Sequence, residues 1–242
     1  MEKKSILKEL TIIFWLFVIG SIVGYIYEMI VVLVQKGYFE SRQGLIYGPF
    51  TPVYGIGAII YYLTLNAINK TYQNKKTNSK ELCNRKYAKI LYYAKIFAIT
   101  ALLGGITEYI SSFVQEKVFG TISWDYSHLW FNLNGRTSLL HCTYWGLAGI
   151  MYVVCIVPLL NKLRKILEEN KLNAVTTVLA VFMIANVAVS WAAGERQRER
   201  KENVSANSRF DRFLDEHYPD EYMDKIFANK KEVNIKPVKI YP

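Results

Sequence analysis

Five apolar stretches, separated by charged connectors, constrain this chain more than any other feature of its sequence. A helix needs about 20 apolar residues to cross the hydrocarbon core of a bilayer, and only helices or closed barrels satisfy their backbone groups there. We therefore predict an all-α polytopic membrane protein with about five transmembrane helices and a transmembrane domain over residues 1–193. The predicted spans are residues of about 10–34, 53–68, 90–114, 137–160 and 172–193.

The two ends of the chain differ from each other. The first apolar run follows a charged start and has no small-residue cleavage site, so we expect a retained anchor. Residues 194–242 form a charged C-terminal tail, in which FDRFLDEHYPDEYMDKIF has enough apolar and aromatic residues for a short amphipathic helix.

The formal net charge of +10 is distributed in a way that indicates membrane topology and lipid head groups rather than nucleic acid. Most lysines and arginines flank apolar runs, and the basic connector 69–89 is expected to be cytoplasmic. Five spans from a cytoplasmic N-terminus would place the tail outside. The basic residues of 196–201 directly after the fifth span oppose that placement, so the sequence leaves the side of the tail open.

A weak internal repeat links the first two spans to the next two. Each copy would be a two-helix unit, so the copies would be parallel and related by an axis along the membrane normal. Chance similarity among glycine-rich apolar helices is the alternative. The matched residues, first copy before second, are Gly24 and Gly104, Glu28 and Glu108, Phe39 and Phe119, Gly44 and Gly135, Tyr54-Gly55 and Trp145-Gly146.

The two repeated glutamates, Glu28 and Glu108, are the sharpest candidates for a binding site. An ionised carboxylate inside a membrane is costly unless it is paired or hydrated, so an intramembrane acid indicates function by default. The candidate partners are Arg42 and Arg136, one in each connector, with His141 as a third. Two alternatives stay open: the pairs lock helices together structurally, or the glutamates lie close enough to water to be ordinary.

The connector between the first two spans contains GLIYGPFTPVYGIG, residues 44–57, which combines glycines and prolines with apolar and aromatic residues. Non-helical backbone at membrane depth is tolerated only where protein or a water-filled cavity surrounds it. We interpret the stretch as a helix entry lining an internal site, with Tyr47, Tyr54 and Trp145 in the lining. A tight turn before a glycine-tolerant helix is the alternative.

Enzymatic chemistry has little support in the sequence. Asp125 and His128 could join Glu108 in an acid–base or metal-ligand cluster, but no HExxH, GxSxG or CxxC pattern strengthens this reading. The three cysteines lack metal-ligand spacing, and we expect no metal and no cofactor. The chain also has no GxxxxGK[ST], so any ATP site must be on another polypeptide.

Several motifs resemble the bacterial ABC-transporter type IV family, the CmpB-type permeases. They are GLIYGPFTPVYGIGA (44–58), WDYS (124–127), NLNGR (132–136), WG (145–146), and RQRER and FLDEHYPDE in the tail. The resemblance covers most of the chain and implies a multi-pass protein of the bacterial cell membrane labelled a permease, with no agreed catalytic residues.

Two functional hypotheses follow. The first is a permease or substrate-binding membrane subunit for a small solute or lipid-like molecule with a cationic or hydroxyl group, partnered by the lipid bilayer and by a separate ATPase subunit. The alternative is a non-transporting scaffold or regulatory protein with structural Glu–Arg pairs. The oligomeric state and the substrate are left open.

Overall fold

The computed structural model describes residues 2–76, 85–159, 162 and 173–233, and most of them are helical. The helices are α1 (Glu2–Lys36), α2 (Pro52–Lys76), α3 (Arg85–Phe119), α4 (Leu139–Met151), the π-helix η1 (Tyr152–Ile156), α6 (Asn173–Lys201), α7 (Arg209–His217) and α8 (Asp220–Ile226). The strands are β1 (Thr121–Ile122), β2 (Asn132–Leu133), β3 (Thr137–Ser138) and β4 (Lys231–Glu232). The predicted all-α class is confirmed.

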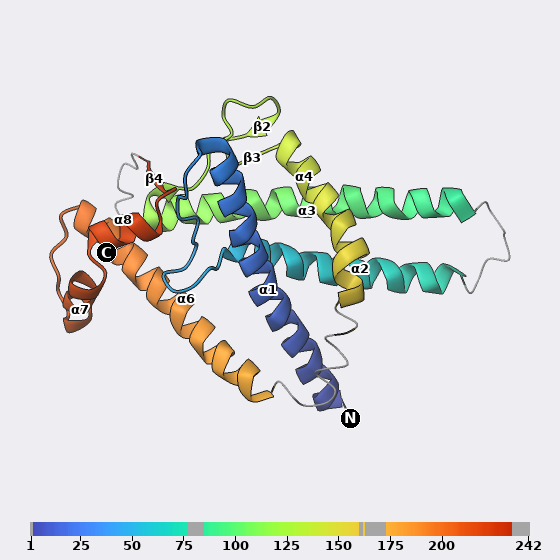
Figure 1. Cartoon of the computed structure of the whole chain (residues 1–242), viewed down its shortest axis with the longest axis horizontal. Coiled ribbons are helices and arrows are strands. Elements are labelled where there is room, and N and C mark those ends of the chain that lie inside the picture. Colours follow the sequence, from blue (N-terminus) through green and yellow to red (C-terminus); the bar gives the residue numbers. More distant parts are fainter. Residues whose placement is uncertain (1, 77–84, 160–161, 163–172, 234–242) are drawn as a thin grey trace, which may run out of the picture.

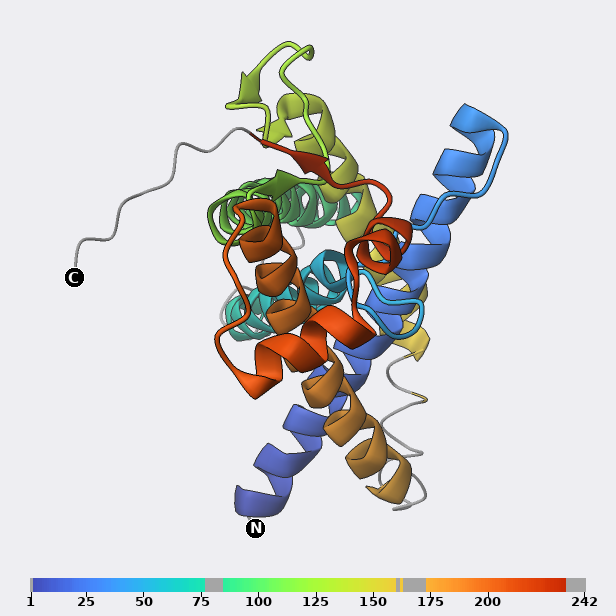
Figure 2. The same cartoon turned by 90° about the vertical axis from the view of Figure 1, so that its left-hand side faces the viewer.

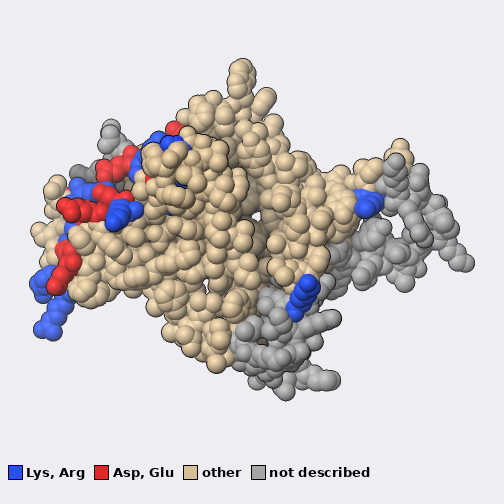
Figure 3. Space-filling model, viewed as in Figure 1, with Lys and Arg blue, Asp and Glu red and all other residues tan. Residues whose placement is uncertain are grey.

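Within the described part of the chain, four helical segments are long and apolar enough to cross a membrane: Ile6–Lys36, Lys89–Phe119, Leu139–Leu159 and Ala174–Lys201. The apolar part of α2, Pro52–Ile68, is shorter, so the predicted count of five spans is approximate. Many large apolar side chains on these helices are exposed, which is unfavourable in water but suits contact with lipid. Figure 3 shows a broad central surface with few charged residues, while the charges gather over the C-terminal end.

The helices pack mainly as two pairs, α1 with α2 and α3 with α4, and the two helices of each pair cross each other. In Figure 1, α1 runs upward and α2 runs to the right, whereas α3 runs from right to left and α4 runs downward. These directions agree with the predicted repeat of two helix pairs, which stays a prediction.

Packing contacts repeat along with the helices. A Cβ atom added to Gly24 would lie 2.2 Å from Cγ of Tyr54, and one added to Gly104 would lie 2.3 Å from Cγ of Trp145. These are corresponding residues of the two copies, and side chains larger than hydrogen would exclude the rings. Close backbone approach at small residues is how membrane helices pack, so the duplicated contact supports the repeat over chance similarity.

Corresponding residues of the two copies also face each other in the centre. The rings of Tyr54 and Trp145 are 5.8 Å apart between centroids, and those of Tyr61 and Tyr152 are 5.7 Å apart. The Tyr61 hydroxyl donates to the backbone oxygen of Trp145 at 2.6 Å. The helices α2 and α4–η1 therefore meet in the centre of the bundle.

The irregular backbone before α2 is satisfied by side chains of α6. The amide of Tyr47 donates to Oδ1 of Asn186 at 3.1 Å, and Nδ2 of Asn186 donates back to the Tyr47 carbonyl at 2.7 Å. The amide of Ile46 donates to Oγ of Ser190 at 2.9 Å. Leu45, Ile46 and Phe50 of this non-helical segment are buried, and its backbone groups at positions 46 and 47 find partners on α6.

The connector between α3 and α4 carries a small hairpin. Strand β2 pairs with β3 in antiparallel register, with Asn132 opposite Ser138 and Leu133 opposite Thr137. The Ser138 hydroxyl accepts from the amide of His141 and caps the start of α4. The hairpin thereby fixes the entry of α4, which brings Thr137 and Trp145 toward α3.

The tail folds back onto the same end of the molecule as these connectors. Strand β4 pairs with β1, directly after α3, and Ser41 donates to the backbone oxygen of Ile226 at 2.6 Å. Buried apolar residues of α6, α7 and α8 pack together with Ile46 of the first connector. Figure 2 shows α7 and α8 against the end of α6. The predicted amphipathic segment is ordered as two short helices.

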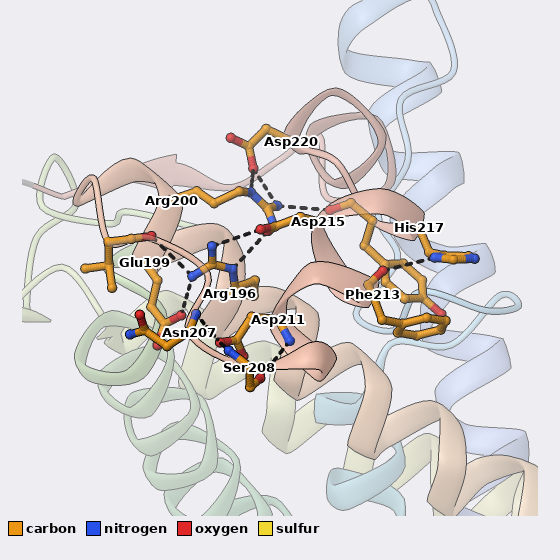
Figure 4. A network of polar contacts seen from close by, with 12 residues as sticks. Arg196, Glu199, Arg200, Asn207, Ser208, Asp211, Phe213, Asp215, His217 and Asp220 are labelled. Carbon is orange, nitrogen blue, oxygen red and sulfur yellow. Dashed lines mark hydrogen bonds and ion pairs between the residues drawn. The ribbon is translucent and has the colours of Figure 1, made fainter.

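The arginines that follow the fifth span are neutralised by acids of the tail (Figure 4). Nε and Nη2 of Arg196 each lie 2.9 Å from a carboxylate oxygen of Asp215, and Arg200 binds both Asp215 and Asp220. The side chain of Arg196 is only 4% exposed, so its charge depends on these partners. The basic cluster therefore gives little net positive charge to the face on which the tail lies.

The tail should detach when its central carboxylate is neutralised. Asp215→Asn leaves Arg196 buried without full charge compensation, and we expect tail docking to weaken by about 2 kcal/mol. Limited proteolysis of the 202–208 loop measures docking.

The bond to Arg196 holds the pKa of Asp215 below its ordinary value of 3.8, so docking should persist at neutral pH and weaken only below about pH 4.

The control for that measurement is Glu216→Gln, which removes an exposed carboxylate from the same helix. Equal proteolysis of the two variants would contradict the role given to Asp215.

Docking of the tail with the α1–α2 and α3–α4 connectors predicts its side of the membrane. In a chain whose Cys142 and Cys155 are replaced by alanine, Cys83 reports on the basic 69–89 connector and Ser205→Cys reports on the tail. We expect a membrane-impermeant maleimide to label the tail cysteine on intact cells and Cys83 only after permeabilisation. Labelling of both from one side would contradict this topology.

Candidate functional site

Glu28 lies eight residues before the end of α1 at Lys36, and Glu108 lies eleven residues before the end of α3 at Phe119. At helical rise these positions are about 12 Å and about 16 Å from the helix ends. The two carboxylates are close enough to interact electrostatically with each other, and both interact with Tyr126. The glutamates of the two copies therefore share one polar region inside the helix bundle.

Glu28 has a simple set of contacts. Its Oε1 accepts a hydrogen bond of 2.5 Å from the hydroxyl of Tyr54, which lies in the first turn of α2. Tyr54 reaches Glu28 because its ring lies on Gly24, one helical turn earlier on α1. Among the described residues, Tyr54 is the side chain with a hydrogen bond to Glu28, and the glutamate is only partly buried.

Glu108 is bound more completely. Its Oε1 accepts from the hydroxyl of Tyr126 at 3.1 Å, and its Oε2 accepts from Oγ1 of Thr137 at 2.8 Å. The Trp145 side chain lies close enough to interact with Glu108, and the glutamate is 6% exposed. Burial and then the nearby Glu108 carboxylate raise the pKa of Tyr126 well above its ordinary value of 10.0, so the phenol remains a donor at neutral pH.

Aromatic rings surround both carboxylates. On one side, Tyr27 lies 6.1 Å from Tyr54 between ring centroids, and Tyr54 in turn contacts Trp145. On the other side, the rings of Tyr126 and His141 stack at 3.6 Å, and Tyr144 lies edge-on to His141 at 5.6 Å. Negative charge beside several ring faces suits a cation, and the phenol groups suit a hydroxyl.

The predicted partners of the glutamates are wrong. Arg42 binds Glu40 at 2.9 Å, and Arg136 forms an ion pair with Glu116. Glu116 is two helical turns nearer the end of α3 than Glu108, about 12 Å along the axis. An ion pair costs less to form near the polar surface than inside the bundle, which explains why the arginines bind the outer carboxylates.

The other predicted site residues divide into two groups. Trp145 and Tyr54 contact the glutamates directly, and His141 reaches the site through its stack with Tyr126. Tyr47 points elsewhere, because its hydroxyl hydrogen-bonds that of Tyr218 in the tail at 2.8 Å. The glycine-rich stretch therefore contributes one of its two tyrosines to the region of Glu28.

Asp125 and His128 do not assemble with Glu108 as metal ligands. Asp125 accepts a hydrogen bond of 2.9 Å from the backbone amide of Ser127, which lowers the pKa of Asp125. Among the described residues, no group of three His, Cys, Asp or Glu side chains could hold a metal ion. Glu108 is instead held by hydroxyl donors.

Reasoning from the sequence missed Tyr126, Thr137, Tyr27 and Tyr144. The first two had a signal, because Tyr126 belongs to the WDYS motif and Thr137 directly follows NLNGR. Their distance from Glu108 along the chain concealed the contact. Tyr27 and Tyr144 carried no pattern that distinguished them from ordinary interfacial tyrosines.

The glycine contacts give a test of how the site is built. Gly24→Ala and Gly104→Ala should each drive an aromatic ring off its helix, with a cost of about 1–3 kcal/mol from overpacking. Thermal unfolding in detergent would show the loss. Val23→Ala, at an exposed position beside Gly24, is the control and should unfold near the wild-type temperature. Unchanged stability of both glycine variants would contradict the packing described.

Comparison with known proteins gives one positive result. Residues 15–191 match the protein family described as "Putative ABC-transporter type IV". The match begins within α1, covers α2, α3, α4 and most of α6, and includes both glutamates. No curated protein matches the chain, and no solved structure matches it either.

Proposed function

Since this chain belongs to the ABC-transporter type IV family, we propose that it is a permease or substrate-binding membrane subunit whose site contains Glu28 and Glu108. Family membership and the apolar helices make it a membrane protein related to transport. The substrate class and the location of the binding site are our proposal.

One observation carries the proposal. Two helix pairs each bring a carboxylate from the first helix against an aromatic side chain from the second, and both carboxylates enter one region. In transporters built from repeats, binding sites lie where the repeats meet. An intramembrane acid is expensive to keep, and a purely structural role would not require a second one at the corresponding position.

The chemistry of the site indicates its substrate class. Carboxylates beside ring faces attract a cationic group, and phenol or indole donors accommodate a hydroxyl group. A small solute or a lipid-like molecule with such a group fits the arrangement. Rocking of the α1–α2 unit against the α3–α4 unit would alternate access to the site.

The energy source would lie on another polypeptide. The sequence contains no GxxxxGK[ST], so this chain lacks the phosphate-binding loop that ABC transport requires. We therefore propose a separate ATPase subunit as partner and a multi-pass location in the bacterial cell membrane. The basic connector 69–89 is on the side expected to face that subunit.

A scaffold role is the second candidate, and a specific observation favours it. Glu108 is almost fully buried with hydrogen bonds to both carboxylate oxygens, and Arg136 is paired with Glu116 at the end of the same helix. Such contacts can lock helices together without a ligand. The two functions differ in what Glu28→Gln should do.

Ligand retention separates the two candidates. The purified chain in lipid nanodiscs is incubated with an extract of its source cells, and retained small molecules are identified by mass spectrometry. We expect the wild type to retain a molecule. Glu28→Gln should retain at least tenfold less of that molecule, because hydrogen bonds to charged groups are worth about 1.5–3 kcal/mol. The thermal stability of Glu28→Gln should be unchanged. Glu108→Gln should lose both ligand and stability.

The matched control is Glu9→Gln. Glu9 also lies on α1 and accepts a 2.5 Å hydrogen bond from a tyrosine of α2, Tyr62, but far from Glu28. This variant should retain the molecule. If the wild type retains nothing and Glu28→Gln changes stability alone, the scaffold is the correct reading.

A further inference from the structure

The two copies of the glutamate are not equivalent. Glu108 has hydrogen-bond donors on both carboxylate oxygens, whereas Glu28 has one donor, on Oε1, among the described residues. Glu108 is buried, whereas Glu28 is partly accessible. A ligand can therefore approach Glu28, while Glu108 is committed to holding Tyr126 and Thr137 in place.

The approach to Glu28 is bordered by tyrosines. Tyr27 of α1 and Tyr144 of α4 are 53% and 52% exposed, and they are close enough to interact electrostatically with each other. Tyr27 packs edge-on against Tyr54, which donates to Glu28. Tyr144 packs edge-on against His141, whose ring stacks on Tyr126. The rings of Tyr54 and Tyr27 thus lie beside Glu28, and Tyr144 of α4 lies near Tyr27.

The surface around these tyrosines is apolar and lies on membrane-spanning segments. On α1 the exposed side chains near Tyr27 include Val23, Ile26 and Ile30, and on α4 those near Tyr144 include Leu140 and Leu147. Both segments are apolar enough to cross a bilayer. Lipid chains therefore contact the helices on either side of the approach to Glu28.

We propose that Glu28 and the rings of Tyr27, Tyr54 and Tyr144 bind the ammonium head of a cationic amphiphile that enters sideways from the bilayer. This inference rests on the proposed function and names its substrate class. Glu28 contacts the cation, and the rings supply cation–π attraction around it. The alkyl chain of the amphiphile lies along the apolar surfaces of α1 and α4.

Glu108 is a positioning residue in this scheme. Through Tyr126 and Thr137 it fixes the α3–α4 connector, and through Trp145 it fixes the ring that packs on Tyr54. It thereby holds the tyrosine that donates to Glu28.

Photo-crosslinking tests the proposal on the full chain in nanodiscs of phosphatidylglycerol and phosphatidylethanolamine. The probe is dodecyltrimethylammonium with a diazirine beside its head group. We expect saturable labelling of peptides containing Tyr27 or Tyr144, and competition by unlabelled dodecyltrimethylammonium. Glu28→Gln should reduce labelling about tenfold or more, and Glu9→Gln should leave it unchanged.

Two further variants keep the test independent of folding. Tyr27→Leu and Tyr144→Leu change exposed side chains and should weaken labelling while preserving thermal stability, whereas Tyr27→Phe should retain it because the ring remains. Glu108→Gln should reduce labelling together with stability, as a positioning role requires.

The competitors decide which part of the proposal stands. Equal competition by uncharged dodecanol would overturn the cation, and equal competition by tetramethylammonium would overturn entry from the bilayer. If cell extract yields an uncharged molecule whose retention needs Glu28, the result supports the proposed function but contradicts the proposal that the ligand carries an ammonium group. If neither a molecule of the extract nor the probe binds in a way that depends on Glu28, both the proposed function and the proposed cationic ligand are contradicted.

Discussion

The packing of an aromatic ring directly on a glycine of the neighbouring helix is the contact on which the rest of this structure depends. At Gly24 the ring is Tyr54, and at Gly104 it is Trp145. Each contact brings two helices together where lipid offers no hydrophobic driving force, so close van der Waals packing must hold them. It also aims a hydrogen-bond donor at the carboxylate one turn further along. Helix association and the polar site therefore have the same origin.

The ends of the helices follow a second constraint, which is that irregular backbone and charge near a membrane need protein partners. Asn186 and Ser190 of α6 bind the backbone before α2, and Arg196 is buried against Asp215 of the tail. The tail carries acids because the end of α6 carries bases. Its docking covers the first connector, so the segment that leads into Tyr54 is held from both sides.

The two glutamates illustrate how a duplicated unit acquires different roles. Both copies keep the glycine, the aromatic donor and the acid, but only the second copy has a hairpin connector that supplies Tyr126 and Thr137. Those hydroxyl groups occupy Glu108 and leave Glu28 as the accessible carboxylate. The proposed site would thus be asymmetric, which suits a ligand with a single charged group.

The sequence by itself determined the all-α membrane class and the approximate spans, because both depend on hydrophobicity and spacing along one helix. It also singled out Glu28 and Glu108 as candidates, because an acid inside an apolar run is visible in the sequence. It also placed Tyr54 and Trp145 at corresponding positions. Only the tertiary structure decided which groups touch. The arginines bind the outer carboxylates, and Glu108 binds hydroxyl groups, because the cost of burying charge depends on depth and on neighbours from distant segments.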